Sequence, residues 1–291
     1  MTAEPSMAII GAGRAGTALG LALAAAGYPV AAVASRRLET AEALARRVGC
    51  PATDRPDDAA RRAAVVWITT PDRAVAEVAG AIAAQGGFSP GQHVFHASGA
   101  LPAAVLSPAR EEGALVAAVH PLQSFAGVTG PPDLAGCCFG VEGDAAALPL
   151  ARRLVADLGG VFLPLRAGDK ALYHAAACVA SNYLVSVLDL AVRLLEGAGL
   201  ERKTATAALL PLVEGTVANV RRAGVAAALT GPVARGDLDT VRGHVEALRA
   251  LDPEAAELYR RLGCYTAGLA RARGDLAPAA AAALELILKG V

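Results

Sequence analysis

The chain has 291 residues, which is long for one ordinary domain and suits two. Hydrophobic residues make up 54% of it, charged residues only 19%, and the formal net charge is zero. This balance gives no reason to expect a nucleic-acid partner or an acidic membrane surface, so we expect a small molecule as the ligand.

A glycine-rich turn follows the first apolar run. Residues 7–10 are apolar and lead into Gly11, Gly13 and Gly16, after which come an Ala/Leu-rich segment and a second apolar run at 30–33. Strand, glycine turn, helix and strand within about 30 residues are typical of a dinucleotide-binding fingerprint. An ordinary glycine turn is the alternative.

Each glycine of this turn has an expected part in cofactor binding. Gly11 would make the tight turn, Gly13 would let the backbone approach a pyrophosphate, and Gly16 would let the helix pack on the strand. Arg14 and Ala15 lie between the last two glycines, at the predicted helix start. The unpaired N–H groups there would face the phosphates.

The residues after the second apolar run favour NADP(H) over NAD(H). An NAD site usually carries Asp or Glu there to bind the ribose 2′-hydroxyl. This chain has Ser35, Arg36 and Arg37 instead. Two guanidinium groups can bind a 2′-phosphate or stack on adenine, although solvated arginines at a helix start would look the same.

The alternation of strands and helices continues to about residue 165. In open α/β sheets, ligands bind beyond the carboxyl ends of the strands, which places Thr70, Pro71, Ser98 and His120 in the cofactor crevice. Asp72 is expected to cap a helix. A histidine at a strand end can transfer protons, or it can be structural. The further strands are expected at 64–69, 93–97, 115–119, 137–141 and 161–165.

The strand pattern ends there, and helices fill the rest of the chain. We therefore predict an α/β protein with an N-terminal Rossmann dinucleotide-binding domain at 1–166 and an all-α C-terminal domain at 167–291. A loop is expected at 230–237. The helices are expected at 169–198, at 203–222 with an interruption at Pro211, at 240–250, from Pro253 and from Ala277.

The first of these helices carries the best group of catalytic candidates. Lys170, His174 and Ser181 fall on one helical stripe at about 100° per residue. An ammonium or imidazolium group can polarise or protonate a developing alkoxide. Lys170 and Ser181 are about 16 Å apart along the helix, so one small substrate would contact Lys170 and His174 but hardly Ser181. Asn182 lies elsewhere on the helix, and an exposed lysine beside a structural histidine is the alternative.

The predicted loop supplies a second candidate, Arg235, whose guanidinium matches a carboxylate. The alternative is a connecting loop in which Asp237 or Asp239 caps the next helix. The five cysteines show no metal-ligand spacing, so we expect free thiols in a reducing compartment and no metal. No run reaches about 18–20 uninterrupted apolar residues, so we expect a cytoplasmic protein without a membrane span.

The motifs together resemble a family. The chain is similar to bacterial proteins that join a Rossmann-like NADP-oxidoreductase domain to an all-helical domain of unknown function, number 2520. The residues that carry the resemblance are the Gly11–Gly16 turn and the segments 70–72, 96–99, 120–124, 170–174 with 181–182, and 230–237.

This resemblance implies a fold similar to 6-phosphogluconate dehydrogenase, ketopantoate reductase and pyrroline-5-carboxylate reductase. It also implies a homodimer formed through the C-terminal domain. Hydroxyacid dehydrogenases and ketopantoate reductases place a lysine at the position of Lys170. They often have asparagine where this chain has His174, which leaves the substrate and the mechanism open.

We therefore expect an NADP(H)-dependent oxidoreductase that reduces a small carbonyl compound, such as the 2-oxo acid ketopantoate. Lys170, His174 and His120 are the catalytic candidates. Ser181, Asn182 and Arg235 are the candidates for substrate binding. The alternatives are an imine reductase, a prephenate-type dehydrogenase, or an NADP(H)-binding regulatory protein without turnover.

Overall fold

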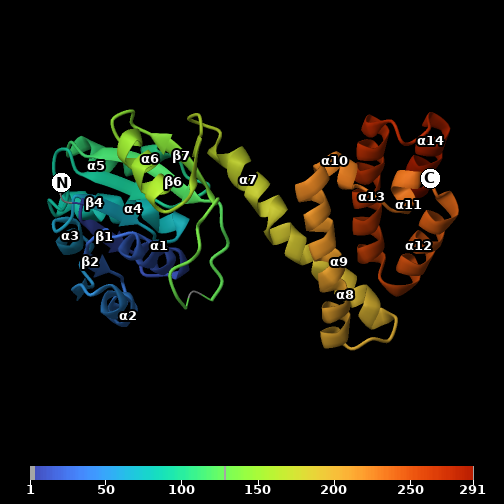
Figure 1. The fold of residues 1–291 in the computed structure, drawn as a ribbon, viewed down its shortest axis with the longest axis horizontal. Coiled ribbons are helices and arrows are strands. Elements are labelled where there is room, and N and C mark those ends of the chain that lie inside the picture. The colour runs from blue at the N-terminus through green and yellow to red at the C-terminus, as the bar shows by residue number, and fades with distance from the viewer. Residues whose placement is uncertain (1–3, 128, 291) are drawn as a thin grey trace. The chain divides into compact units, whose positions relative to one another are not determined.

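The computed structural model describes residues 4–127 and 129–290. The chain divides into two compact units, Met1–Asn182 and Tyr183–Val291. The first holds a sheet with helices, and the second is helical (Figure 1), which confirms the predicted fold class. The predicted change from strands to helices at 166–168 lies before the end of the first unit, because that unit includes the first long helix of the helical region.

The sheet has eight strands in the order β3-β2-β1-β4-β5-β6-β7-β8. The first six in this order are parallel, β7 is antiparallel to β6, and β8 is parallel to β7. The parallel order is the Rossmann order, which reverses between β1 and β4 and opens a ligand crevice there. The strands are β1 Met7–Ile10, β2 Val30–Ala34, β3 Ala52–Thr53, β4 Val65–Ile68, β5 His93–His96, β6 Leu115–Pro121, β7 Cys138–Gly143 and β8 Val161–Pro164.

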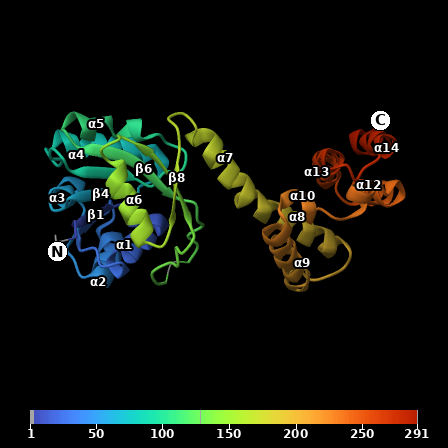
Figure 2. The ribbon, with the colours of Figure 1, turned by 45° about the horizontal axis from the view of Figure 1, so that its top comes forward.

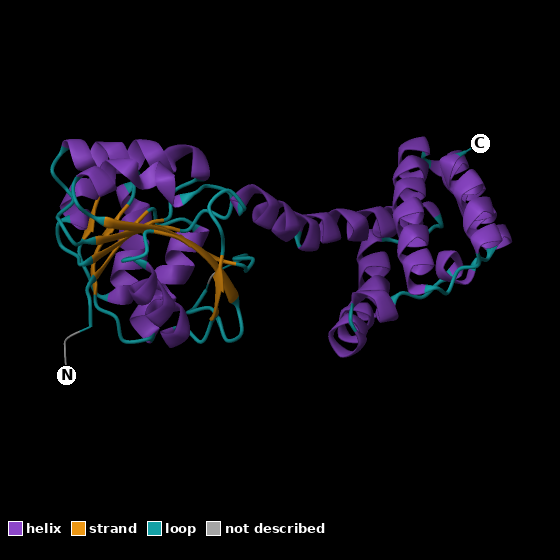
Figure 3. Cartoon of the chain, turned by 90° about the horizontal axis from the view of Figure 1, so that it is seen from above, coloured by secondary structure: helices purple, strands orange, loops and turns teal. Residues whose placement is uncertain are grey.

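Helices cover both faces of this sheet (Figure 3). Helices α1, α2 and α6 pack on one face, and α3, α4 and α5 on the other, each face with its own apolar core. The central strands are apolar throughout because both of their faces are buried. The helices are α1 Arg14–Ala25, α2 Leu38–Val48, α3 Pro56–Ala60, α4 Asp72–Ala84, α5 Ser107–Glu111, α6 Leu148–Asp157 and α7 Lys170–Ala180, with a 3₁₀ turn η1 at Ala103–Leu106.

Two local predictions in this unit need correction. Strand β6 continues through His120 and Pro121 because these residues pair with Gly140 and Phe139 of β7, so His120 lies within the strand. Pro71, and not Asp72, is the N-cap residue of α4, and no side chain caps that helix. Asp72 contributes only a favourable negative charge in the first turn.

The second unit is built from seven helices among the residues described. Helices α11 to α14 enclose an apolar core that includes Val241, Ala270 and Leu284, and α13 and α14 lie side by side (Figures 1 and 2). The helices are α8 Asn182–Gly197, α9 Arg202–Ala223, α10 Val225–Ala228, α11 Pro232–Arg235, α12 Leu238–Leu251, α13 Pro253–Arg273 and α14 Pro278–Lys289.

Three predictions for the helical region change. The helix expected at 169–198 is divided at Ser181 into α7 and α8. Pro211 lies inside an unbroken α9, and a short helix, α11, occupies the predicted loop. The Asp237 carboxylate accepts a hydrogen bond from the Thr240 N–H. Of the two residues expected to cap the next helix, Asp237 and Asp239, it is therefore Asp237 that caps α12.

One stretch, Lys170–Gly197, is long and apolar enough to cross a membrane when length and composition alone are considered, with a mean hydropathy of 1.7 over an 18-residue window. The sequence analysis did not select this stretch because it looked for an uninterrupted apolar run, and Ser181, Asn182 and Asp189 interrupt this one.

Candidate functional site

A cleft of about 480 Å³ opens at the carboxyl ends of β1, β2 and β4 in the first unit. This is the reversal point of the sheet, where the topology places a dinucleotide. Its lining combines glycines, hydroxyl groups and arginines. The lining residues are Ile10, Gly11, Ala12, Gly13, Ala34, Ser35, Arg36, Arg37, Thr40, Asp54, Pro56, Thr69, Thr70, Pro71, Arg73, Ala74, Glu77 and Val78.

Gly11 and Gly16 have the steric roles that the sequence predicts, and Gly13 leaves the space that its predicted role requires. Gly11 has φ +104°, a conformation that strains other residues. A Cβ on Gly16 would lie 1.9 Å from the Gly11 carbonyl oxygen, so only glycine lets α1 approach the turn this closely. A Cβ on Gly13 would meet no atom within 4 Å, which leaves its backbone open to a ligand. No side chain caps α1, so its first N–H groups remain available for an anion.

Thr70 provides a direct sign of fit to a ligand. Thr70 lines the cleft, and its hydroxyl oxygen is buried without a hydrogen-bond partner among the residues described. An unsatisfied buried hydroxyl is costly, and a bound ligand would satisfy it. The neighbouring Thr69 is different, since its hydroxyl donates 2.7 Å to the Gly11 carbonyl and stabilises the glycine turn.

Arginines reach the cleft from two elements. Arg36 and Arg37 follow β2 as predicted, and Arg73, on the first turn of α4, lines the same cleft. The sequence analysis missed Arg73, although its place beside the predicted Thr70-Pro71 turn could have indicated it. Asp54 and Glu77 add carboxylates to the lining, so the positive charge lies at the arginines and does not extend over the whole cleft.

A second cavity, of about 700 Å³, lies between the end of β6 and helix α7 in the first unit. His120 and His174 line it together, as do Ser181 and Asn182, so the structure brings four of the predicted site residues to one cavity. The lining residues are His120, Leu122, Gln123, Ser124, Leu163, Tyr173, His174, Ala176, Ala177, Cys178, Ala180, Ser181 and Asn182.

Lys170 lies beside this cavity but is buried, with 2% of its surface exposed. Its Nζ donates a 2.8 Å hydrogen bond to the Ser98 carbonyl oxygen at the end of β5. Burial lowers the pKa of this ammonium group to about 8, although the charges of Glu142 and Asp72 act in the opposite direction. Lys170 therefore places a positive charge at the sheet edge and holds the Ser98 backbone.

Tyr173 contacts His120 directly and was missed by the sequence analysis. The Tyr173 hydroxyl lies 2.9 Å from His120 Nδ1, and the two rings meet edge to face. Burial lowers the pKa of His120 to about 4, helped by the nearby charges of Lys170, His174 and His96. His120 is therefore neutral near pH 7.

His174 belongs to the same group of imidazoles. Its ring centroid lies 6.3 Å from that of His120, and its Nδ1 lies 3.9 Å from the Cys178 sulfur. His96 has a structural role instead, because its two ring nitrogens bond the Pro102 carbonyl oxygen and the Ser98 N–H.

Other predicted residues are placed differently. Arg14 and Ala15 start α1 but do not line the dinucleotide cleft. The Ser98 hydroxyl does not line it either, because it accepts the N–H groups of Ala100 and Leu101 and shapes the turn after β5. Arg235 ends α11 in the second unit, where it is exposed, and its binding of a carboxylate stays a prediction.

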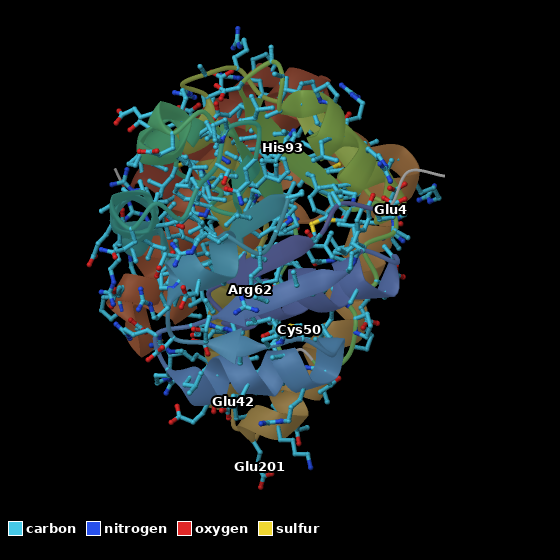
Figure 4. All side chains as sticks on the ribbon, turned by 90° about the vertical axis from the view of Figure 1, so that its left-hand side faces the viewer. Glu4, Glu42, Cys50, Arg62, His93 and Glu201 are labelled. Carbon is cyan, nitrogen blue, oxygen red and sulfur yellow. The ribbon has the colours of Figure 1, made fainter. Side chains whose placement is uncertain are left out.

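The cysteines are free thiols, as expected, and all five are partly exposed. Cys50, which follows α2, is labelled in Figure 4. Within the described part of the chain, no group of three or more His, Cys, Asp or Glu residues could hold a metal ion.

The fold and the cleft define a two-unit protein of the Rossmann class. Two family models match the chain: a Rossmann-like domain over residues 2–121 and the domain of unknown function DUF2520 over residues 137–266. Both domains of the resemblance that the sequence motifs indicate are thus matched in this chain.

Solved structures share this fold across nearly the whole chain. A proposed NADP oxidoreductase from Bacteroides fragilis is 24% identical, with a TM-score of 0.74, and the match covers 91% of this chain and 98% of that one. A pyrroline-5-carboxylate reductase from Coxiella burnetii is 15% identical, with a TM-score of 0.62 and coverages of 94% and 99%.

An imine reductase from Myxococcus stipitatus, solved with NADP⁺, is 20% identical, with a TM-score of 0.59 and coverages of 92% and 93%. None of the curated proteins matches this chain.

Proposed function

We propose that this chain is an NADP(H)-dependent oxidoreductase that reduces the C=O or C=N bond of a small compound. The observation that carries the proposal is the juxtaposition, on one edge of one sheet, of a dinucleotide cleft and a cavity lined by two imidazoles. The named activities of the structural neighbours support the same class of chemistry.

The cofactor would bind with its pyrophosphate at the Gly11–Gly16 turn and its 2′-phosphate near the arginines. The Thr70 hydroxyl and the open backbone at Gly13 fit such a ligand. Arg36, Arg37 and Arg73 supply the positive charge that an NADP site needs and an NAD site lacks. When bound, the reduced nicotinamide supplies the hydride.

The chain's own residues would prepare the bond to be reduced. His120 and His174 line the cavity and can donate hydrogen bonds to an oxygen or nitrogen that gains negative charge. The buried Lys170 ammonium adds positive potential at the same edge and keeps the Ser98 carbonyl in place. Ser181 and Asn182, which line the same cavity, would orient the rest of the substrate.

Three kinds of substrate are candidates. A 2-oxo acid such as ketopantoate needs a cation for its carboxylate, and Arg235 is the predicted one. No arginine or lysine is among the residues that line the cavity itself, which favours the second candidate, an imine. Prephenate, as the substrate of an NADP⁺-dependent oxidation, is the third compound to test.

The first experiment titrates purified protein with NADPH and NADH, and then follows nicotinamide absorbance with 2-oxo acids, cyclic imines and prephenate. We expect NADPH to bind at least tenfold more tightly than NADH, and one compound class to turn over. Lys170→Ala should lose most of this turnover, whereas the exposed Lys203→Ala should not. Lack of NADPH binding would refute the proposal, and binding without any turnover would favour the regulatory protein.

The second unit is proposed to form a homodimer. Helices α8 and α9 leave large apolar side chains exposed, among them Val185 and Leu212, each with 67% of its surface exposed. Only one residue of the 22-residue α9, Ala205, is buried. A protein surface rarely keeps such side chains in water unless a partner covers them.

A further inference from the structure

The pair formed by Tyr173 and His120 joins two elements of the first unit. Tyr173 stands on the first turn of α7, and His120 near the end of β6. The Tyr173 hydroxyl lies 2.9 Å from His120 Nδ1, with the ring centroids 5.6 Å apart and the ring planes at 89°. The distance between the hydroxyl oxygen and Nδ1 is that of a normal hydrogen bond.

The direction of this hydrogen bond follows from the acceptors within reach of the phenol. The Tyr173 hydroxyl carries one hydrogen, and two acceptors of His120 lie near it: Nδ1 at 2.9 Å and the carbonyl oxygen at 3.4 Å. The shorter contact lies in the normal hydrogen-bond range and the longer one lies outside it.

Donation by Tyr173 fixes the tautomer of His120. A neutral imidazole carries one proton, and a ring nitrogen that accepts a hydrogen bond cannot carry it. With Nδ1 as the acceptor, the proton of neutral His120 is on Nε2. The same logic explains why a catalytic imidazole is usually oriented by the partner of its other nitrogen.

His120 Nε2 faces the turn after β5 and the cavity that His174 shares. A Cβ on Gly99 would lie 2.9 Å from His120 Nε2, so the missing side chain opens this space. In the part of the chain that the structure describes, no residue forms a hydrogen bond with Nε2, which leaves it available to a ligand in the cavity.

Burial keeps His120 neutral, and the charges around it act in the same direction. Lys170, Tyr173 and His174 face it from α7, and His96 faces it from β5. Among them the Lys170 ammonium is the charge that opposes a second proton on the ring. A neutral imidazole can still act as a hydrogen-bond donor to a polarised carbonyl, as enzymes with other folds demonstrate.

We propose that Tyr173 is a positioning residue that holds His120 in its neutral Nε2–H tautomer, and that this Nε2–H polarises the substrate's C=O or C=N. The inference rests on the proposed reductase function. When bound, the reduced nicotinamide would supply the hydride for the new C–H bond, and the π electron pair would move to the oxygen or nitrogen that Nε2–H contacts. Solvent water would then supply the proton that completes the product and would carry away the hydroxide.

The direct test is nitrogen NMR of the imidazole rings in the purified protein without cofactor. Long-range ¹H–¹⁵N spectra distinguish a protonated from an unprotonated ring nitrogen, and the His120 signals are assigned by their loss in His120→Gln. We expect Nε2 protonated and Nδ1 unprotonated between pH 6 and 8, and a mixture of tautomers in Tyr173→Phe. A wild-type His120 with its proton on Nδ1, or an unchanged spectrum in Tyr173→Phe, would overturn the inference.

The second unit offers a matched control. His244 Nδ1 lies 2.9 Å from the Tyr259 hydroxyl, with the ring planes at 88°. Tyr259→Phe should therefore change the spectrum of His244 and leave that of His120 as it is. If Tyr173→Phe unfolds in thermal melts, the wild-type spectrum alone still decides the tautomer.

Kinetics then connect the tautomer to turnover. For a substrate found by the panel, Tyr173→Phe should lower kcat about tenfold and leave KM within about twofold, because an oriented donor acts mainly in the transition state. Failure of NADPH to bind would refute the proposed function whatever the tautomer. Binding and turnover with the proton on Nδ1 would refute only this inference.

Discussion

Gly99 is a residue on which the geometry of the second cavity depends. A Cβ at this position would lie 2.6 Å from His174 Cδ2 and 2.9 Å from His120 Nε2. Gly99→Ala should therefore move both imidazoles, lower turnover at least tenfold and cost about 1–3 kcal/mol of stability through overpacking. NADPH affinity should stay within about twofold, since Gly99 does not line the dinucleotide cleft.

The matched control for this change is Gly80→Ala in α4. A Cβ on Gly80 would meet no atom within 4 Å, so the substitution should raise stability by about 0.5–1 kcal/mol through helix propensity. Thermal melts and steady-state kinetics on the two variants provide the comparison. Wild-type turnover in Gly99→Ala would show that the imidazoles need not keep these positions.

The buried Lys170 predicts a pH dependence of stability. Its pKa falls from 10.5 to about 8, mainly because burial disfavours the charge. Between these two values the unfolded chain binds more protons than the folded one, so the free energy of unfolding rises with pH there. Below about pH 8 the full cost of the buried charge is present, and the shift corresponds to about 3 kcal/mol.

Urea unfolding of wild type and Lys170→Met from pH 7 to 10.5 measures this contribution. Across this range the free energy of unfolding of the wild type should rise by up to about 3 kcal/mol relative to that of the variant, because methionine has no proton to lose. Lys203→Met, at an exposed position, should show a constant difference from wild type. A constant difference for Lys170→Met would mean that the ammonium is not destabilised by burial.

The elements that the sequence predicts best are those whose conformation depends on residues close together in the chain. The β1–α1 turn needs its glycines for steric reasons that operate within a few residues, so Gly11 and Gly16 could be assigned before the structure. Tyr173 could not, because its contact with His120 joins residues 53 positions apart across α7 and β6. The length of β6 depended in the same way on β7, its antiparallel partner.

The arginines at the cleft also differ in whether the sequence alone could predict them. Arg36 and Arg37 follow β2 directly and were predicted, whereas Arg73 reaches the cleft from α4 only because β1 and β4 are neighbours in the sheet. The Arg36→Ala/Arg37→Ala variant should bind NADPH at least tenfold more weakly and bind NADH as before, because only NADPH has a 2′-phosphate. Arg73→Ala should have a smaller effect in the same direction.

Calorimetric titration with both nucleotides measures these changes, with the exposed Arg62→Ala (Figure 4) as the control. If the double variant keeps its preference for NADPH, then the 2′-phosphate lies elsewhere and the arginines after β2 are solvated surface residues.

At the scale of the whole molecule, the apolar surface of α8 and α9 carries the prediction of a homodimer. Burying a side chain such as Leu212 or Val185 contributes about 1.5–3 kcal/mol, so a few of them can hold two copies together. Light scattering should give twice the mass of the chain. A Val185→Glu/Leu212→Glu variant should give the monomer mass, because an interface core does not accommodate unpaired charges. The same masses in both proteins would contradict the assignment of these two helices. Glutamates placed at Leu38 and Leu122, which are exposed in the first unit, serve as the control and should leave the mass unchanged.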